Sequence, residues 1–313
     1  MSGGKGPAVA VVGAGAVGGY FGGRLAAAGH DVRFLARGAG LEALRTDGLH
    51  VADGAGGWSV PAVRASDDPG ELGPVDHVLL CVKTSQLAAA LDGIGPLIGP
   101  ATAVVTVQNG VEAPEQVAAA LGRDRVLPGL VRVVAATEGP GRIRHVGPPG
   151  ALAFAEWDSG TSERVERLRA ALRDAGVGVP EPTDVRAELW GKFLLVAPIG
   201  SVGAATGATI GELRSRPGTR NLLIAGMREV YETALKLGIG LPADAVERAV
   251  ELMDRQAPDA TSSLQRDVLA GRPSELDAWT GAVVRLAGRA GLAAPVHETL
   301  LALLALHQEK AAR

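Results

Sequence analysis

Residues 8–18 read Ala-Val-Ala-Val-Val-Gly-Ala-Gly-Ala-Val-Gly, an apolar run that leads directly into three spaced glycines. The run predicts a buried strand, and the helical spacing of Val17–Ala28, followed by Gly29, predicts a helix with a glycine at its end. A second apolar run, Asp31–Ala36, completes a strand–helix–strand unit of about 30 residues. This order of elements is typical of a doubly wound parallel sheet.

The three glycines have different expected tasks in such a unit. Gly13 permits the tight turn, Gly15 lets the backbone approach a pyrophosphate, and Gly18 lets helix and strand pack closely. Backbone N–H groups and the helix dipole then bind the anion. A purely structural glycine-rich turn is the alternative, because a chain with 44 glycines offers chance matches. The expected cofactor-binding residues of this dinucleotide turn are Gly13, Ala14, Gly15, Ala16, Val17 and Gly18.

The end of the second strand distinguishes NAD from NADP. An acid at this place binds the ribose 2′-hydroxyl, whereas an arginine without an acid accommodates a 2′-phosphate. This strand ends Phe34-Leu35-Ala36-Arg37, and the first acid after it is Glu42. The guanidinium of Arg37 offers a planar fork to a phosphate, so we predict NADP (NADPH) as the cofactor. A solvated surface arginine is the alternative reading.

The hydrophobic pattern of the chain changes near Thr183. Strand and helix patterns alternate before this residue, and long helical patterns dominate after it. Residues 1–183 are predicted to form a Rossmann-type doubly wound sheet domain, and residues 184–313 an all-helical domain. Further strands are expected at Val75–Val82, Ala103–Val107, Val126–Ala136, Gly150–Glu156 and Val177–Val179, with a helix at Glu163–Asp174. The expected helices of the second domain are Asp184–Thr206, Gly218–Leu237, Ala243–Gln256, Ser262–Ala270, Ser274–Ala290 and Pro295–Glu309.

Composition restricts the classes of function. A formal net charge of −3 gives no electrostatic reason to expect nucleic acid as a partner. The single cysteine, Cys81, excludes an intramolecular disulfide and is expected to be a buried small hydrophobe in a reducing cytoplasm. Residues 1–7 lack the apolar core of a signal peptide, and we expect no membrane partner because no apolar run approaches ~20 residues. No His/Cys cluster has zinc-ligand spacing, and the six histidines, His145 included, are interpreted as structural.

Polar residues interrupt apolar segments at a few places. Lys83 follows a buried strand, and Asn109 follows the next one, where a doubly wound sheet places its ligands. Lys192 is a cation on an otherwise apolar helix, so its ammonium either reaches the surface or faces a site. Each of these positions taken alone is also compatible with a structural role.

Taken together, these motifs resemble those of the ketopantoate reductase (2-dehydropantoate 2-reductase) family over residues 8 to 309. The matching pieces are Gly13–Gly18, Arg37, Val82-Lys83-Thr84, Gln108-Asn109-Gly110, Leu189-Trp190-Gly191-Lys192 and Ser263 with Glu275-Leu276-Asp277. The resemblance implies an NADPH-dependent reductase of a small 2-oxo acid, with a helical domain for substrate binding and a possible homodimer.

The resemblance also implies a role for individual residues. Lys192 matches the catalytic lysine, which polarises the keto group and protonates the forming alkoxide. Glu275 matches the glutamate that holds substrate or cofactor hydroxyls and orients the lysine. Ser263 matches the serine that binds the substrate carboxylate. Asn109 and Lys83 match residues of the cleft on the cofactor and substrate sides.

The sequence departs from the family pattern after the lysine. The family usually has asparagines four and eight residues later, whereas this chain has Val196 and Gly200. We therefore keep three functions open. The first is the reduction of ketopantoate toward pantothenate, and the second is the reduction of another branched or aromatic 2-oxo acid by a relative of the mandelate-dehydrogenase kind. The third, of a different class, is a non-catalytic NADP-binding sensor or scaffold; other two-domain dehydrogenases, such as those for polyol phosphates, are a further alternative.

Overall fold

The computed structural model describes residues 6–54 and 56–311, so the expectation for the first five residues lies outside it. The chain forms two compact units, described separately below. The first consists of Met1–Gln108 and Ala113–Val185. The second consists of Arg186–Arg313 together with the short segment Asn109–Glu112, which lies between two parts of the first unit in the sequence.

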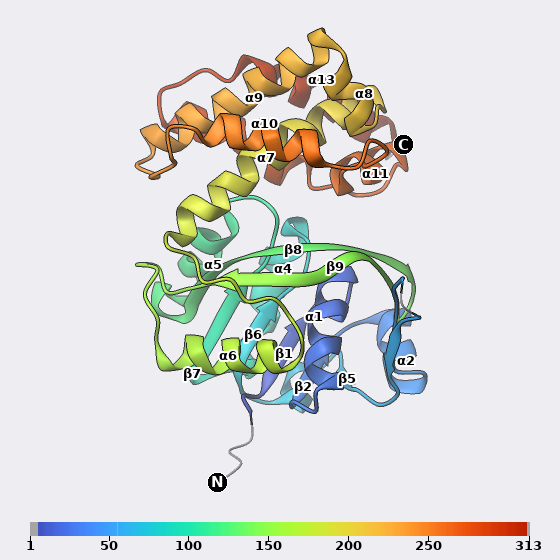
Figure 1. Cartoon of the computed structure of the whole chain (residues 1–313). Helices are drawn as coiled ribbons and strands as arrows, with labels where there is room; N and C mark the ends of the chain where they lie inside the picture. The colour runs from blue at the N-terminus through green and yellow to red at the C-terminus, as the bar shows by residue number, and fades with distance from the viewer. Residues whose placement is uncertain (1–5, 55, 312–313) are drawn as a thin grey trace. The chain divides into compact units, whose positions relative to one another are not determined.

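The first unit is built on one nine-stranded sheet with the order β4-β3-β9-β8-β7-β6-β1-β2-β5. Strands β5, β2, β1, β6, β7 and β8 are parallel, and β8 pairs with β9 in antiparallel fashion as the long pair in Figure 1. The strands are β1 (Val9–Val12), β2 (Val32–Leu35), β3 (Leu49–Ala52), β4 (Trp58–Val60), β5 (Arg64–Ser66), β6 (Val75–Leu80), β7 (Ile98–Thr106), β8 (Val126–Gly139) and β9 (Arg142–Phe154). The predicted doubly wound fold is thereby confirmed.

Both faces of the sheet are buried at the central strand β1, which explains why this strand is apolar throughout. In β1, Val9 and Val11 belong to one core cluster, whereas Ala10 and Val12 belong to another. Side chains of α1, α2 and α6 fill the first cluster, and those of α3, α4 and α5 the second. These helices are α1 (Ala16–Ala27), α2 (Gly38–Thr46), α3 (Pro69–Leu72), α4 (Leu87–Gly93), α5 (Ala113–Leu121) and α6 (Glu163–Asp174).

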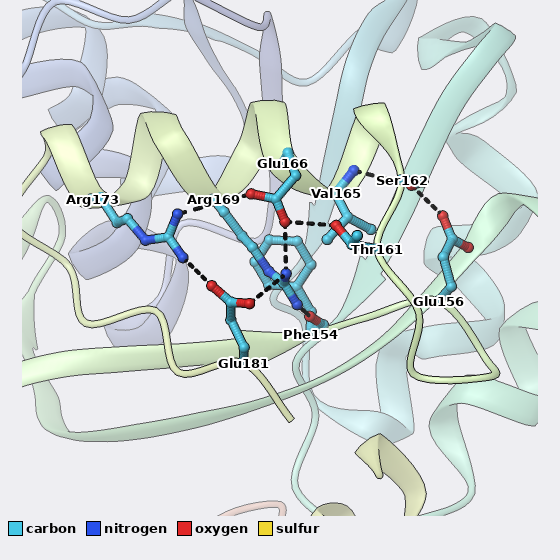
Figure 2. A network of polar contacts seen from close by, with 9 residues as sticks. All are labelled: Phe154, Glu156, Thr161, Ser162, Val165, Glu166, Arg169, Arg173 and Glu181. Carbon is cyan, nitrogen blue, oxygen red and sulfur yellow. Dashed lines mark hydrogen bonds and ion pairs between the residues drawn. The ribbon is translucent and has the colours of Figure 1, made fainter. Parts of the chain in front are cut away.

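A buried arginine joins α6 to the end of β9 (Figure 2). The side chain of Arg169 is only 3% exposed and forms ion pairs with Glu166 at 2.7 Å and with Glu181 at 3.4 Å. It also donates a hydrogen bond to the carbonyl of Phe154 at 3.0 Å and lies over that residue's ring. Because a buried charge is tolerated only when paired, this network fixes α6 and the segment after it on the sheet.

The second unit is helical. Its helices are α7 (Val185–Thr206), α8 (Ile210–Ser215), α9 (Pro217–Lys236), α10 (Ala245–Arg255), α11 (Ser263–Leu269), the π-helical turn η4 (Asp277–Gly281), α12 (Ala282–Arg289) and α13 (Pro295–Ala311). Helix α7 is long and apolar enough to cross a membrane, contrary to the expectation that no run approaches that length. However, 67% of its apolar window is buried inside the protein, as in the core helix of a soluble domain.

Several elements differ from the sequence predictions. The strand expected at Val177–Val179 is a single bridge between Gly178 and Ala151, because this segment leaves the sheet edge after one contact. The helix expected over Ser274–Ala290 begins later and opens with the π-helical turn η4 before α12. Elements α2, α3, α4, α5, α8, β3, β4 and β5 were not predicted. They are short, and short elements carry little hydrophobic periodicity.

Candidate active site

The glycine-rich turn lies between β1 and α1. Gly13 has a φ of +96°, and a Cβ there would lie 2.9 Å from Val82 Cγ1. A Cβ at Gly18 would lie 2.1 Å from the Gly13 carbonyl oxygen, so this helix can pack against the strand only with glycine. At Gly15, by contrast, a Cβ would meet no atom within 4 Å. Gly13 and Gly18 therefore have no room for a side chain, whereas the space beside Gly15 is free of protein atoms and could admit a pyrophosphate.

The start of α1 suits an anion. Its N-cap residue is Gly15, and no acidic side chain occupies its first turn. The first N–H groups of a helix lack intrahelical acceptors and carry the positive end of the dipole. Behind the turn, burial raises the pKa of the Cys81 thiol to about 12, so this thiol stays neutral although the residue as a whole is partly exposed. The turn thus offers donors to a phosphate without a reactive nucleophile beside it.

Arg37 lies one strand away from the turn. It follows β2, whose Leu35 pairs with Val12 of β1, and it is the N-cap residue of α2. The Arg37 side chain is exposed and makes no ion pair within residues 6–54 and 56–311, and the first turn of α2 contains no acid. A guanidinium and a second helix N-terminus therefore stand at the end of β2, where a 2′-phosphate would be bound.

The ends of β6 and β7 are tied together by Gln108. Its side-chain amide is buried and donates to the carbonyls of Leu80 at 2.8 Å and Val82 at 3.1 Å. Lys83 follows immediately as an exposed residue at the start of a short 3₁₀ turn. The polar loops expected from the sequence therefore do lie on neighbouring parallel strands at their carboxyl ends.

Lys192 and Asn109 are brought together within the second unit. Lys192 lies on α7 between buried apolar residues and is itself half-buried. Its Nζ donates a hydrogen bond to Asn109 Oδ1 at 2.8 Å, across 83 residues of sequence. The amide oxygen holds the ammonium at a defined place on the helix.

Ser263 and Glu275 lie on two other elements of this unit. Ser263 is the first residue of α11, whose N-cap is Ser262, and Glu275 precedes the π-helical turn η4. These elements meet α7 at Gly200. A Cβ at Gly200 would lie 2.7 Å from Trp279 Cζ3 and 3.3 Å from Leu264 Cδ2.

This contact explains why position 200 is a glycine. The six-membered ring of Trp279 occupies the space that a side chain at 200 would need, and Trp279 is only 3% exposed. Its Nε1 is buried without a hydrogen-bond partner among the residues that the structure describes. The face of α7 two turns beyond Lys192 is therefore covered by an aromatic ring rather than lined by an amide.

Sequence reasoning missed three residues of this region: Trp279, Glu112 and Arg285. Glu112 forms an ion pair with Arg285 at 2.7 Å, although the two residues lie 173 positions apart in the sequence. The weak signal available was the position of Glu112 three residues after Asn109. Over the described part of the chain, no group of three or more His, Cys, Asp or Glu side chains is arranged to hold a metal ion.

Comparison with known proteins identifies the family of the chain. The family model described as "Ketopantoate reductase PanE/ApbA" matches residues 9–159, and the model of its C-terminal part matches residues 184–308. A 2-dehydropantoate 2-reductase from Mesorhizobium japonicum is 33% identical over 317 residues, covering 95% of this chain and 96% of that one.

Solved structures give the same result. A PanE/ApbA family ketopantoate reductase from Ralstonia eutropha superposes with a TM-score of 0.89 and 31% identity, over 97% of this chain and 99% of that one. D-mandelate dehydrogenase, solved with NADH and anilino(oxo)acetate, shares the fold with a TM-score of 0.88 at 19% identity, over 97% of this chain and 99% of that one. The resemblance seen in the sequence motifs is confirmed, and the chain belongs to the ketopantoate reductase family.

Proposed function

We propose that this protein reduces ketopantoate (2-dehydropantoate) to pantoate with NADPH, as a 2-oxo acid reductase. Membership of the ketopantoate reductase family supports the reaction class. The observation that carries the proposal is the hydrogen bond between Lys192 Nζ and Asn109 Oδ1, since it holds a cation at a fixed position on an apolar helix. Pantoate formation would serve pantothenate biosynthesis in the cytoplasm.

The first unit supplies the cofactor-binding residues of this proposal. The open side of the turn at Gly15 fits a pyrophosphate, with the N–H groups of residues 13–18 as donors. Arg37 would bind the 2′-phosphate of NADPH, and Lys83, which follows β6, would contact the cofactor or substrate, together with Asn109 of the second unit. The bound nicotinamide supplies the hydride that C2 of the oxo acid receives.

The second unit supplies the residues for the substrate. Lys192 polarises the C2 carbonyl and gives a proton to the alkoxide oxygen as the hydride arrives, so that a 2-hydroxy acid leaves. Ser263 binds the carboxylate of the substrate. Glu275 holds hydroxyls of substrate or cofactor and orients the lysine. The ammonium acts mainly in the transition state, because full negative charge on the oxygen exists only there.

One observation favours a second candidate, the reduction of a different 2-oxo acid with an apolar branched or aromatic tail. Val196 and the indole of Trp279 above Gly200 present carbon atoms on the Lys192 face of α7. A site without buried polar partners gives little advantage to a substrate hydroxyl and loses little when that hydroxyl is absent.

The decisive test follows NADPH oxidation by the purified protein with a matched pair of substrates. Ketopantoate and 3,3-dimethyl-2-oxobutanoate differ only in one hydroxyl group. We expect both to be reduced, with kcat/KM values within about tenfold of each other, because a site that offers the hydroxyl no buried polar partner loses little when the hydroxyl is absent. A thousandfold preference for ketopantoate would show that its hydroxyl has other partners.

The same assay separates the enzyme from a sensor. A non-catalytic NADP-binding protein would bind NADPH, seen as a change in its fluorescence, and oxidise it with no 2-oxo acid in a panel of aliphatic and aromatic tails. That result would contradict the proposed activity while leaving the cofactor assignment intact.

A further inference from the structure

The segment Asn109–Glu112, here called the crossing segment, has an unusual place in the molecule. In sequence it connects β7 to α5, both in the first unit, yet it belongs to the second unit. Its first residue, Asn109, accepts the hydrogen bond from Lys192. Whatever fixes this segment in the second unit therefore also fixes the partner of Lys192.

Backbone packing holds the middle of the crossing segment against η4. Gly110 has a φ of +101°, a conformation that favours glycine, and a Cβ there would lie 2.9 Å from the carbonyl oxygen of Ala278. Val111 packs against the hydrophobic core of the second unit. The segment thus lies directly on the π-helical turn without room for a side chain at position 110.

Two ion pairs hold the far end of the segment, a close one to Arg285 and a longer one, at 3.8 Å, to Arg289. Glu112 has a side chain that is 15% exposed, and its carboxylate pairs with Arg285 Nη2 at 2.7 Å. The same guanidinium donates to the Asp277 carboxylate at 2.5 Å and to the Asp277 carbonyl at 3.1 Å. Arg285 therefore links the crossing segment to the π-helical turn. The contacts of Arg285 with Glu112 and Asp277 are called the clamp below.

Glycine at position 281 makes room for this clamp. A Cβ at Gly281 would lie 2.9 Å from Asp277 Oδ1 and 3.1 Å from Arg285 Nη1. The wide turn of a π-helix and the missing side chain together let the guanidinium reach both carboxylates. The π-helical turn is a backbone irregularity, and such irregularities in helices concentrate at functional sites.

We propose that Arg285 and Glu112 are positioning residues for Lys192, acting through the crossing segment and Asn109. The inference rests on the proposed role of Lys192 as proton donor. A lysine side chain is long and flexible, and a catalytic group displaced by about 1 Å can lose on the order of 10²-fold in rate. The clamp keeps Asn109 Oδ1 at one place in the second unit, so that the ammonium it holds stays at one position.

The first experiment removes the clamp with Arg285→Met and measures kcat and KM. We expect kcat to fall about 10- to 100-fold with the KM for NADPH within about threefold, because only the proton donor loses its place. The matched control is Arg220→Met, which breaks a bidentate ion pair with Asp254 (2.7 and 2.8 Å) between α9 and α10 of the same unit. This control should leave kcat unchanged. A kcat for Arg285→Met within threefold of the natural protein would overturn the proposal.

The second experiment asks whether the effect passes through Asn109. In an Asn109→Ala background the added Arg285→Met change should lower kcat by less than about threefold, since the contact it positions is already gone. If the two losses multiply instead, Arg285 acts by another route and the inference is wrong. Arg285→Lys, which keeps one charge opposite Glu112, should restore part of kcat.

A readout without turnover separates this inference from the proposed function. Brief competitive acetylation followed by mass spectrometry measures the reactivity of Lys192 in the folded protein. We expect Arg285→Met and Asn109→Ala to raise that reactivity at least twofold, and Arg220→Met to leave it unchanged. Should the natural protein reduce no 2-oxo acid, this labelling still decides whether the clamp holds Lys192.

Discussion

Lys192 is the residue on which the proposed chemistry depends most. We expect Lys192→Ala to keep the fold and the affinity for NADPH but to lower kcat by a factor on the order of 10²–10⁴, the usual contribution of a positioned proton donor. The loss should fall on kcat more than on KM, because the ammonium acts mainly near the transition state. Arginine at this position should restore little, since it keeps the charge but gives up a proton poorly.

Single-turnover hydride transfer measures this prediction directly, because it excludes slow product release. A rate in Lys192→Ala within threefold of the natural protein would show that another group is the acid.

Arg37 carries the prediction for the cofactor. With an exposed guanidinium at the end of β2 and no acid before Glu42, we expect NADPH to be favoured over NADH by more than about tenfold in kcat/KM. Arg37→Ala should weaken NADPH and leave NADH nearly unchanged, so NADH serves as the internal control. Equal use of both cofactors by the natural protein would contradict the assignment.

His77 gives the first unit a pH dependence. It is 1% exposed in β6, and burial lowers the pKa of its imidazole, although the hydrogen bond from Nε2 to the Arg164 carbonyl at 2.8 Å opposes this in part. The unfolded chain therefore takes up a proton at higher pH than the folded one, and stability should fall as pH drops below about 6.5.

Thermal unfolding at pH 7.5 and pH 5.5 checks the role of His77. His77→Gln keeps an N–H donor but does not titrate, so its melting temperature should change less between the two pH values than that of the natural protein. An identical change in both proteins would assign the pH dependence to other groups.

At the residue scale, the sequence indicated candidate site residues at positions where the local context is unusual. Lys192 stood out because a cation interrupts an apolar helix, and the glycines of the turn because of their spacing after a strand. Trp279 and Arg285 could not be found in this way. Their roles arise from contacts with Gly200 and Glu112, residues far away in the sequence.

At the scale of elements, α13 shows how one side chain from another helix can hold a helix start. Glu229 of α9 accepts hydrogen bonds from the backbone N–H groups of Val296 at 2.7 Å and His297 at 3.1 Å, and from His297 Nδ1 at 2.6 Å. His297 is completely buried, and Glu229 is 10% exposed. The carboxylate therefore serves as the cap that α13 needs at its first turn.

We expect Glu229→Ala to destabilise the protein by about 2–4 kcal/mol, since it removes a helix cap and leaves buried donors unpaired. Denaturant unfolding measures the change, and Glu229→Gln, which keeps an acceptor, should lose less. The matched control is Glu232→Ala on the exposed side of the same helix, expected to change stability by less than about 0.5 kcal/mol. A loss for Glu229→Ala no larger than for the control would disprove the capping role.

The elements predicted best were those whose apolar pattern repeats over several turns. Glu163–Asp174 has the bounds expected, and α7, α9 and α13 differ from expectation by only a residue or two at each end. The π-helical turn η4 has no signal of its own in the local hydrophobic pattern. Its Asp277 shares Arg285 with Glu112, a residue more than 160 positions earlier in the sequence.

At the scale of the whole molecule, the sequence showed the change from sheet to helices. It did not show that the crossing segment belongs to the second unit. The motif Gln108-Asn109-Gly110 looked like one loop at the end of a strand, whereas its residues divide between the two units after Gln108. Nothing in the local sequence marks that division. Gln108 anchors the sheet side through Leu80, and Asn109 anchors the helical side through Lys192.

The two ends of the nine-stranded sheet have a consequence for how the protein behaves at high concentration. The outermost strands, β4 and β5, are only three residues long, and the N–H and C=O groups that they leave at the margin are correspondingly few. Long, flat margins are what allow one chain to extend the sheet of another and to start insoluble fibres. At these two margins of the folded first unit, such templated aggregation has little backbone on which to begin.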